Sequence, residues 1–292
     1  MSDVLANLIA KKFIARSDVK AVQRVLQDGT VIYMPHLDKS QSDPDAKRLP
    51  WTRADLNAHL ANEATFGHYL LNTDSKCKLF VIDIDLAKTG YLPRAVVGQD
   101  AWATDEKFHE WESSFLPVDD LRAAWLDRAD PGRTWMKRQF KLVAHMLVKT
   151  IHEGLEIPCA VAYSGNKGIH VYGFTGWDKP TSANLAREGA RTVLESLDCF
   201  EPLRGENFFR HTNQDPVDGF PNLEIEIFPK QDTLEGKDLG NLVRLPLGRN
   251  LKNPKDQTFF IDMTTSINEM KPLDPEWALT EGAINPWRRA GE

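Results

Sequence analysis

Apolar and polar residues alternate most clearly in the run LFVIDID at residues 79–85, which is the most strongly strand-like segment of the chain. Further strands are predicted in the runs CAVAYS, IHVYGF, NLEIEIF and NLVRLPL, and an earlier hairpin in AVQRVL and TVIYMP around Asp28 and Gly29. Apolar residues recur at helical spacing near residues 4–14, 52–60, 135–151 and 182–197. Because strands and helices mix without the regular alternation of a doubly wound sheet, the pattern predicts an α+β fold.

Two carboxylates lie at the end of the first of these strands. Successive side chains of a strand point to opposite faces, so Asp83 and Asp85 share one face, roughly 7 Å apart. Like charges this close cost free energy unless a cation compensates them. Their hard oxygen atoms suit Mg²⁺ or Mn²⁺. The pattern alone leaves two interpretations open, a metal site and a pair of solvent-facing aspartates.

A glycine-rich hairpin is predicted at residues 164–168, the run SGNKG. Its two glycines allow positive φ angles and let backbone N–H groups face an anion, and Lys167 adds a charge suited to phosphate. His170 falls just inside the following strand, where its ring can donate to a phosphate oxygen. The alternative is an ordinary hairpin with a half-buried histidine.

A second acidic strand is predicted at residues 223–228. Alternation places Glu224 and Glu226 on one face and Leu, Ile and Ile on the other, and Lys230 follows the strand. The arrangement repeats that of the first acidic strand.

A basic strand comes next, in which Arg244 lies within an otherwise apolar run, and Arg249 and Lys252 follow it. An arginine in such a strand is costly unless it is paired. Its partner is expected to be either a glutamate on a neighbouring strand or a bound triphosphate.

Composition and charge narrow the class of protein. Hydrophobic residues make up 41% and charged residues 27% of the 292 residues, as in ordinary globular proteins. The formal net charge is −6. Because Lys and Arg supply the non-specific affinity for nucleic acid, this charge argues against a DNA-coating protein. It is compatible with an enzyme that has a local basic groove.

The three cysteines, Cys77, Cys159 and Cys199, are isolated and form no CxxC pair. This spacing argues against a zinc knuckle and a disulfide framework, and burial as small apolar side chains is predicted. No run approaches the ~18 apolar residues of a membrane span, and the N-terminus does not resemble a secretory signal. A cytoplasmic protein without membrane association is expected.

Tryptophans concentrate in the less regular segment 87–134. Trp102, Trp111, Trp125 and Trp135 lie in or beside it. Exposed indole rings there would stack on the bases of a template strand, whereas buried rings would belong to the core. The core interpretation is favoured.

In their order along the chain, the DxD strand, the SGNKGIHVY hairpin and the acidic strand followed by a basic one resemble the three motifs of the archaeo-eukaryotic primase superfamily. The string EIFPKQ looks like the branch found in TOTE conflict-system and CRISPR-associated primase-polymerases, and GNLVRLPLG looks like the family's nucleotide-binding strand. The resemblance covers roughly residues 51–252.

The resemblance implies a catalytic core of two antiparallel-sheet modules, of which the second is similar to the RNA-recognition fold. A catalytic domain is expected at residues 1–255, with an N-terminal module at 1–90, a helical insert at 91–150 and the RRM-like module at 151–255. Residues 256–292 are expected to be an extension or linker.

The resemblance also implies the roles of the site residues. Asp83, Asp85 and Glu226 would be catalytic and would hold two Mg²⁺ or Mn²⁺ ions. The residues implied to bind the nucleotide are Ser164, Asn166, Lys167, Gly168, His170, Lys230, Arg244, Arg249 and Lys252. One position departs from several relatives, because Asn250 stands where they have a histidine after the basic strand.

The implied function is that of a template-directed DNA primase-polymerase that joins NTP or dNTP substrates, with single-stranded DNA as template and primer. A helicase or another component of a replication or defence system is the expected protein partner. Three alternatives remain open. They are a gap-filling or end-joining repair polymerase, disfavoured by EIFPKQ; a metal-dependent nuclease, disfavoured by the triphosphate-binding residues; and a non-catalytic DNA-binding module, disfavoured by the three acids.

Overall fold

The fold is built on two antiparallel sheets. The structure is a computed structural model and describes residues 3–40, 42–93, 115–130, 132–176, 178–289 and 291. Within these residues, the larger sheet has eight strands in the spatial order β11 (Phe200–Arg204), β12 (Phe208–His211), β13 (Leu223–Phe228), β5 (Phe80–Leu86), β9 (Gly168–Gly173), β8 (Cys159–Tyr163), β15 (Phe259–Ile261) and β16 (Pro272–Leu273). The smaller sheet has the order β14 (Leu242–Arg244), β3 (Phe66–Tyr69), β1 (Ala21–Val25) and β2 (Val31–Pro35).

Helices and short ribbons complete the described fold. The helices are α1 (Asp3–Phe13), α2 (Arg53–Leu60), α4 (Leu121–Leu126), α5 (Gly132–Lys149), α6 (Ala183–Glu195), α7 (Pro275–Ala278) and α8 (Glu281–Ile284), and α5 continues into a π-helical turn at Thr150–Gly154. Two ribbons pair β4 (Lys76–Cys77) with β10 (Thr181–Ser182) and β6 (Gly90–Pro93) with β7 (Phe115–Val118). The α+β prediction is confirmed.

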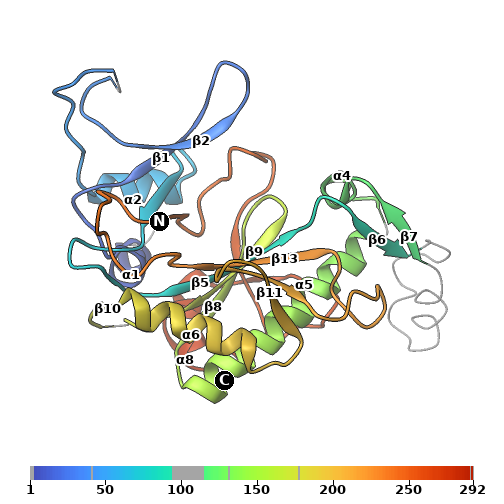
Figure 1. Ribbon diagram of the computed structural model, residues 1–292. Coiled ribbons are helices and arrows are strands. Elements are labelled where there is room, and N and C mark those ends of the chain that lie inside the picture. The colour runs from blue at the N-terminus through green and yellow to red at the C-terminus, as the bar shows by residue number, and fades with distance from the viewer. Residues whose placement is uncertain are drawn as a thin grey trace.

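The main core lies between the larger sheet and its helices. On β5, Phe80, Ile82 and Ile84 are fully buried. Helix α6 packs against β5 and β13, and α5 packs against β8 and β9. Figure 1 shows α5 and α6 below the larger sheet and the β1–β2 hairpin above it. The apolar face of β5 is therefore covered by helices, and its other face, which carries the aspartates, is free to line a site.

Several predicted elements are confirmed, among them the β1–β2 hairpin, β5, the β8–β9 hairpin, β13 and the four helices α1, α2, α5 and α6. The threonine that precedes α2, Thr52, caps this helix, because its side chain accepts a hydrogen bond from the backbone N–H of Asp55, whose own side chain completes a capping box. The β6–β7 ribbon and the β11–β12 hairpin were not predicted, since β7 and β11 show little apolar alternation and expose much of their surface.

Strand β14 does not lie beside β13. It pairs with β3 and so joins the smaller sheet, although it follows β13 in the sequence. Conversely, β5 comes from the predicted N-terminal module but lies between β9 and β13 in the larger sheet. Both sheets therefore combine strands from either side of the module boundaries drawn from the sequence. The end of the chain contributes β15, β16, α7 and α8, and β15 pairs with β8.

The predictions for cysteines and tryptophans can be compared with the described residues. All three cysteines are free; Cys77 and Cys159 are buried and Cys199 is partly buried. Trp125 and Trp135 are buried in the core, as favoured, while Trp102 and Trp111 lie outside the described residues. In the part of the chain that the structure describes, no helix has the length and apolarity to span a bilayer.

Candidate active site

The register of three strands brings the acidic residues together. Strand β5 lies between β9 and β13, and Asp83 is paired directly with His170 on one side and with Glu226 on the other. Asp85 is paired with Gly168 and with Glu224. Directly opposed residues of antiparallel strands project from the same face, with Cβ atoms about 5 Å apart. Acids from two distant segments therefore form one cluster.

The cluster is electrostatically unfavourable on its own. The pKa of Asp83 is raised well above its usual range by burial and by the negative charges of Asp85 and Glu226. Asp83 Oδ1 is buried and accepts no hydrogen bond from the described residues. Such oxygen atoms cost free energy unless a cation compensates them.

Two lysines lie against this cluster. Lys167 Nζ is 3.3 Å from Asp85 Oδ2 and donates to the carbonyl of Leu86 at 2.9 Å. Lys230 Nζ forms an ion pair with Glu226 Oε1. Two of the three lysines predicted to bind the nucleotide thus contact carboxylates in this structure.

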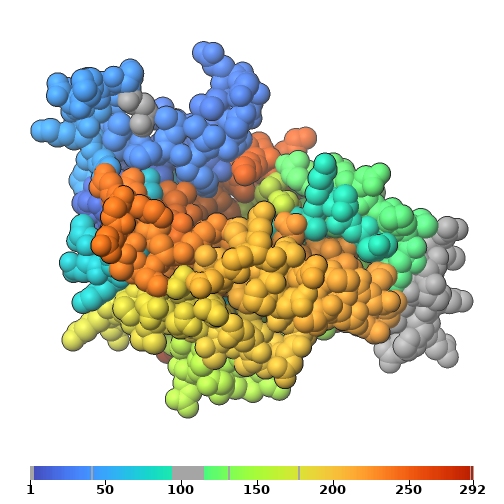
Figure 2. All heavy atoms as spheres, viewed as in Figure 1, coloured from blue at the N-terminus to red at the C-terminus, as the bar shows by residue number. Residues whose placement is uncertain are grey.

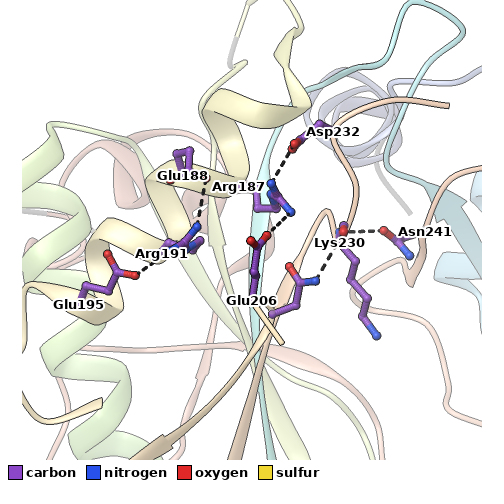
Figure 3. Close-up of polar contacts among 9 residues, drawn as sticks. Arg187, Glu188, Arg191, Glu195, Glu206, Lys230, Asp232 and Asn241 are labelled. Carbon is purple, nitrogen blue, oxygen red and sulfur yellow. Dashed lines mark hydrogen bonds and ion pairs between the residues drawn. The ribbon is translucent and has the colours of Figure 1, made fainter. Parts of the chain in front are cut away.

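The position of Lys230 is fixed through its backbone. Its N–H donates to Asn241 Oδ1 at 2.7 Å, and its carbonyl accepts from Asn207 Nδ2 at 3.5 Å (Figure 3). Arg187, from α6, donates to Asp232 at 2.8 Å and to Glu206 at 3.1 Å, and so joins the segment that follows β13 to the segment that precedes β12. The Lys230 side chain extends from this anchored loop, with its ammonium 4.7 Å from the centre of the Phe228 ring.

His170 is held as a neutral donor. It is only 8% exposed, and burial and the nearby Arg244 lower its pKa to about 3. Its Nδ1 is 3.0 Å from the hydroxyl of Tyr172, and its Nε2 is 3.4 Å from Asp83 Oδ1. Burial raises the pKa of Tyr172, which keeps its hydroxyl protonated. When that hydroxyl donates to Nδ1, the ring proton is on Nε2 and faces the acidic cluster.

A cleft of about 190 Å³ lies over the aspartates, between the two sheets. The smaller sheet contributes Gln23, Tyr33 and β14 to its walls. The predicted site residues that line it are Asp83, Asp85, Ser164, Asn166, His170, Arg244 and Lys252. Figure 2 shows the surface hollowed between the blue β1–β2 hairpin and the green α4 segment.

Within the described residues, Arg244 has no glutamate partner, which was one of the two partners left open by the sequence. It is buried, and its guanidinium donates to the carbonyls of Ser164 and of Gly248, the latter at 3.4 Å. It is not paired with a glutamate within the described residues, because β14 lies in the other sheet. Arg244 thus joins the smaller sheet to the β8–β9 loop, and it also lines the cleft.

Asn250 and Gln23 connect the same parts of the molecule. Asn250 Nδ2 donates to the carbonyl of Ser164 at 3.2 Å, and its Oδ1 accepts from Gln23 Nε2 at 3.2 Å. Gln23 Oε1 in turn accepts from the backbone N–H of Leu251 at 2.8 Å. Sequence analysis missed Gln23 and Tyr33 as lining residues, and it noted Asn250 only as a departure from relatives. The signal available in the sequence was a glutamine within the strand-like run AVQRVL.

The glycines of the hairpin loop serve different purposes. Gly165 has a φ of +75°, as expected for an anion-binding turn. Gly168 permits close contact between β9 and β5, because a Cβ there would lie 2.1 Å from Asp85 Oδ1. Of the two remaining predicted cations, Lys252 is exposed and lines the cleft, whereas Arg249 is exposed but is not part of the cleft wall.

The donor chemistry fits a divalent cation. Three carboxylates supply hard oxygen atoms, and Asp83 Oδ1 is buried without a hydrogen bond to the described residues. Within the described residues, however, no group of three acidic, histidine or cysteine side chains is already arranged to hold an ion. Glu226 Oε1 is paired with Lys230 in this structure.

Comparison with known proteins gives the family. The family model described as the archaeo-eukaryotic primase domain of TOTE conflict systems matches residues 6–280. A solved structure of the polymerase domain of ligase D from Mycobacterium tuberculosis, in complex with DNA, is similar at 12% identity and a TM-score of 0.40, over 97% of this chain and 87% of that one. No curated protein matches.

The match over nearly all of the chain shows that it belongs to the archaeo-eukaryotic primase domain family of TOTE conflict systems. It is therefore an enzyme of the nucleotidyltransferase type. The resemblance stated from the sequence motifs is confirmed.

The raised pKa of Asp83 predicts that this carboxylate destabilises the metal-free fold. A carboxyl group with a raised pKa in the folded state costs stability as pH rises above its unfolded value of about 3.9. Asp83→Asn should therefore increase the free energy of unfolding by about 0.5–2 kcal/mol at pH 7 in EDTA. The increase should shrink as the pH falls toward 4, in urea titrations monitored by circular dichroism.

The matched control is Asp45→Asn, at an exposed carboxylate far from β5 in the sequence. It should change the free energy of unfolding by less than about 0.5 kcal/mol. A destabilised Asp83→Asn variant at pH 7 would contradict the electrostatic description of the cluster.

Proposed function

We propose that this chain is a template-directed DNA primase-polymerase that forms phosphodiester bonds from nucleoside triphosphates. The observation that carries the proposal is the row of Glu226, Asp83 and His170 across three adjacent strands, of which Asp83 and His170 line a cleft whose wall also carries Arg244. Such a row places metal-binding oxygen atoms, a neutral donor and a cation around one small volume. These are the groups that phosphoryl transfer requires.

Asp83, Asp85 and Glu226 are the residues that would hold two Mg²⁺ or Mn²⁺ ions. Ions bound there would supply Lewis-acid chemistry, activating a primer hydroxyl and offsetting charge on the triphosphate. Without bound ions, Lys230 pairs with Glu226 and Lys167 pairs with Asp85. Release of Lys230 would free the Glu226 carboxylate to bind an ion and would free the Lys230 ammonium to contact the triphosphate.

The remaining residues bind and orient the substrate. The Nε2–H of His170 is a donor for a phosphate oxygen and stays neutral at pH 7, because its pKa is about 3. Ser164 and Asn166 line the cleft and are further candidates for contact with the nucleotide, in the loop that Gly168 closes. Lys252 offers an exposed charge in the cleft wall, and Arg249 offers a second exposed charge three residues earlier in the chain.

The other partners follow from the reaction. Template and primer are single-stranded DNA, and base pairing reads the template, so the protein itself needs no base-specific contacts. A protein that needs few contacts with nucleic acid can have a net charge of −6. The conflict-system context in the description of the family supports a helicase or another replication or defence component as a protein partner.

Two glutamates on the same face of β13 allow a sharp test of the catalytic acids. Glu226 is opposite Asp83 and Glu224 is opposite Asp85. Glu226→Ala should lower nucleotide incorporation by about 100-fold or more, as should Asp83→Ala and Asp85→Ala, because each removes a ligand of the ions that would offset negative charge in the transition state. Glu224→Ala, the matched control, should stay within threefold of the wild type.

The assay uses labelled NTPs or dNTPs, Mn²⁺ and unprimed circular single-stranded DNA, with product sizing and circular dichroism of each variant. Extension of a primed template without synthesis on the unprimed circle would assign the chain to gap filling. Loss of the DNA without added nucleotide would assign it to nuclease chemistry. Robust synthesis by Glu226→Ala would contradict the catalytic assignment.

Lys252 gives a separate prediction for nucleotide binding. Its side chain is exposed at the cleft wall, so Lys252→Ala should raise the KM for the nucleotide by about three- to tenfold, the size of one partly screened charged contact. The kcat should remain within twofold. Lys237→Ala, which removes an exposed lysine outside the cleft wall, should leave both constants unchanged. A lowered kcat with an unchanged KM would place Lys252 outside triphosphate binding.

A further inference from the structure

A second pocket, larger than the catalytic cleft, opens between the α4–α5 segment and the edge of the larger sheet formed by β15 and β16. Its volume is about 610 Å³, which is within the usual range for small-ligand sites. We call it the Arg133 pocket. The residues used below are its lining residues Trp125, Arg128, Arg133, Lys137, Tyr163 and Phe259.

The Arg133 pocket carries an excess of positive charge. Arg128, Arg133 and Lys137 line it, and Asp256 is the one carboxylate among its described lining residues. Asp256 is already engaged, because it accepts from Arg128 at 2.9 Å and from the hydroxyl of Tyr163 at 3.1 Å. Arg133 and Lys137 therefore have no unpaired carboxylate among the described lining residues of the pocket.

Arg133 and Lys137 are accordingly arranged as anion-binding groups. Arg133 Nε is buried and makes no hydrogen bond to the described residues, and its guanidinium lies 5.2 Å from the centre of the Trp125 ring. Burial and then the charge of Arg133 lower the pKa of Lys137. Both residues lie in the first turns of α5, where the positive end of the helix dipole adds to their charge.

An aromatic wall faces these cations. Tyr163 and Phe259 have ring centres 5.5 Å apart, and Phe259 remains partly exposed in the pocket. An exposed aromatic face beside cations suits a nucleotide, because the base can stack while the phosphate contacts the charged groups. An inorganic anion would use only one of these two features.

The Arg133 pocket and the catalytic cleft share a wall. The side chain of Asn166 lines the cleft, while its carbonyl accepts from Trp125 Nε1 at 2.7 Å and from the Tyr163 hydroxyl at 3.1 Å. Both of these donors line the pocket. A ligand in the pocket would therefore lie next to the residues that hold the catalytic loop.

One chain segment also runs from the cleft to the pocket. It begins at Asn250 in the cleft wall and ends at Phe259 in the pocket, and it carries the exposed cations Lys252 and Lys255 on the way. Exposed cations along such a path are suited to successive phosphates of a polynucleotide. An isolated nucleotide would have no use for them.

We propose that the Arg133 pocket seats one nucleotide of a single strand of nucleic acid outside the catalytic cleft, with a phosphate on Arg133 and Lys137 and a base against Phe259. The strand would follow the segment 250–259 toward the catalytic acids. This proposal rests on the proposed function, since a polymerase must hold a strand beyond the reacting nucleotide. A free nucleotide could make the same phosphate and base contacts, and the test below distinguishes it from a nucleic-acid strand.

The test is the binding of fluorescently labelled oligo(dT) by the full chain in EDTA, followed by anisotropy at several salt concentrations. Arg133→Gln/Lys137→Gln should weaken binding by about tenfold or more and reduce the slope of log affinity against log salt by about 1.4, which corresponds to two lost phosphate contacts. Phe259→Leu should weaken binding by about tenfold through lost stacking, with an unchanged salt slope.

The matched control is Arg210→Gln/Lys149→Gln, which removes the same two charges elsewhere. Arg210 lies on β12, the second strand from the opposite edge of the larger sheet, and Lys149 is exposed at the far end of α5. Its affinity should stay within twofold of the wild type. Equal affinities of the Arg133/Lys137 variant and this control would overturn the proposal.

Competition by dTMP and dTTP distinguishes a nucleic-acid strand from a free nucleotide as the ligand of the Arg133 pocket. Weak competition by either nucleotide, with the oligonucleotide effect intact, supports a strand. Loss of nucleotide binding in the Arg133/Lys137 variant without loss of oligonucleotide binding would overturn the strand in favour of a free nucleotide. The incorporation assay on the same preparations tests the proposed function independently, because oligonucleotide binding in EDTA requires no catalysis.

Discussion

Carboxylates held side by side on one sheet face are the constraint on which the rest of this site depends. The register of β5 between β9 and β13 opposes Asp83 to Glu226, and burial together with the charges of Asp85 and Glu226 raises the pKa of Asp83. The fold compensates with side chains from three directions. Lys167 and Lys230 pair with the acids, and His170 is kept neutral so that it adds a donor without a further charge.

These compensating groups are held by segments other than the acidic strands. Lys230 depends on Asn241 and Asn207, and the surrounding segments depend on Arg187. The opposite wall depends on Arg244 and Asn250, which connect the smaller sheet to the β8–β9 loop through the carbonyl of Ser164. The cleft is therefore a property of both sheets, and a change in their relative position would alter the distance between the acids and the cations.

The sequence predicted the local part of this arrangement. Alternation within LFVIDID and LEIEIF was sufficient to place Asp83, Asp85 and Glu226 on defined strand faces, because side-chain direction follows residue parity. The glycine turn and His170 followed in the same way. Strand pairing was less accessible, since it is set by long-range packing. The position of β14 beside β3 removed Arg244 from the glutamate strand, and the bridge from Gln23 to Asn250 joins residues more than 200 positions apart in the sequence. The pairing of Lys167 and Lys230 with carboxylates depends on side-chain conformation, which periodicity does not encode.

The proposed divalent-cation site requires acids from two distant strands to bind ions together. Mn²⁺ titration, with free Mn²⁺ measured by electron paramagnetic resonance, can compare the wild type with a Glu226→Gln variant. The wild type should bind up to two ions, and the variant should bind fewer ions or bind them more weakly. Identical Mn²⁺ binding by the two proteins, or no binding by the wild type, would refute the shared site.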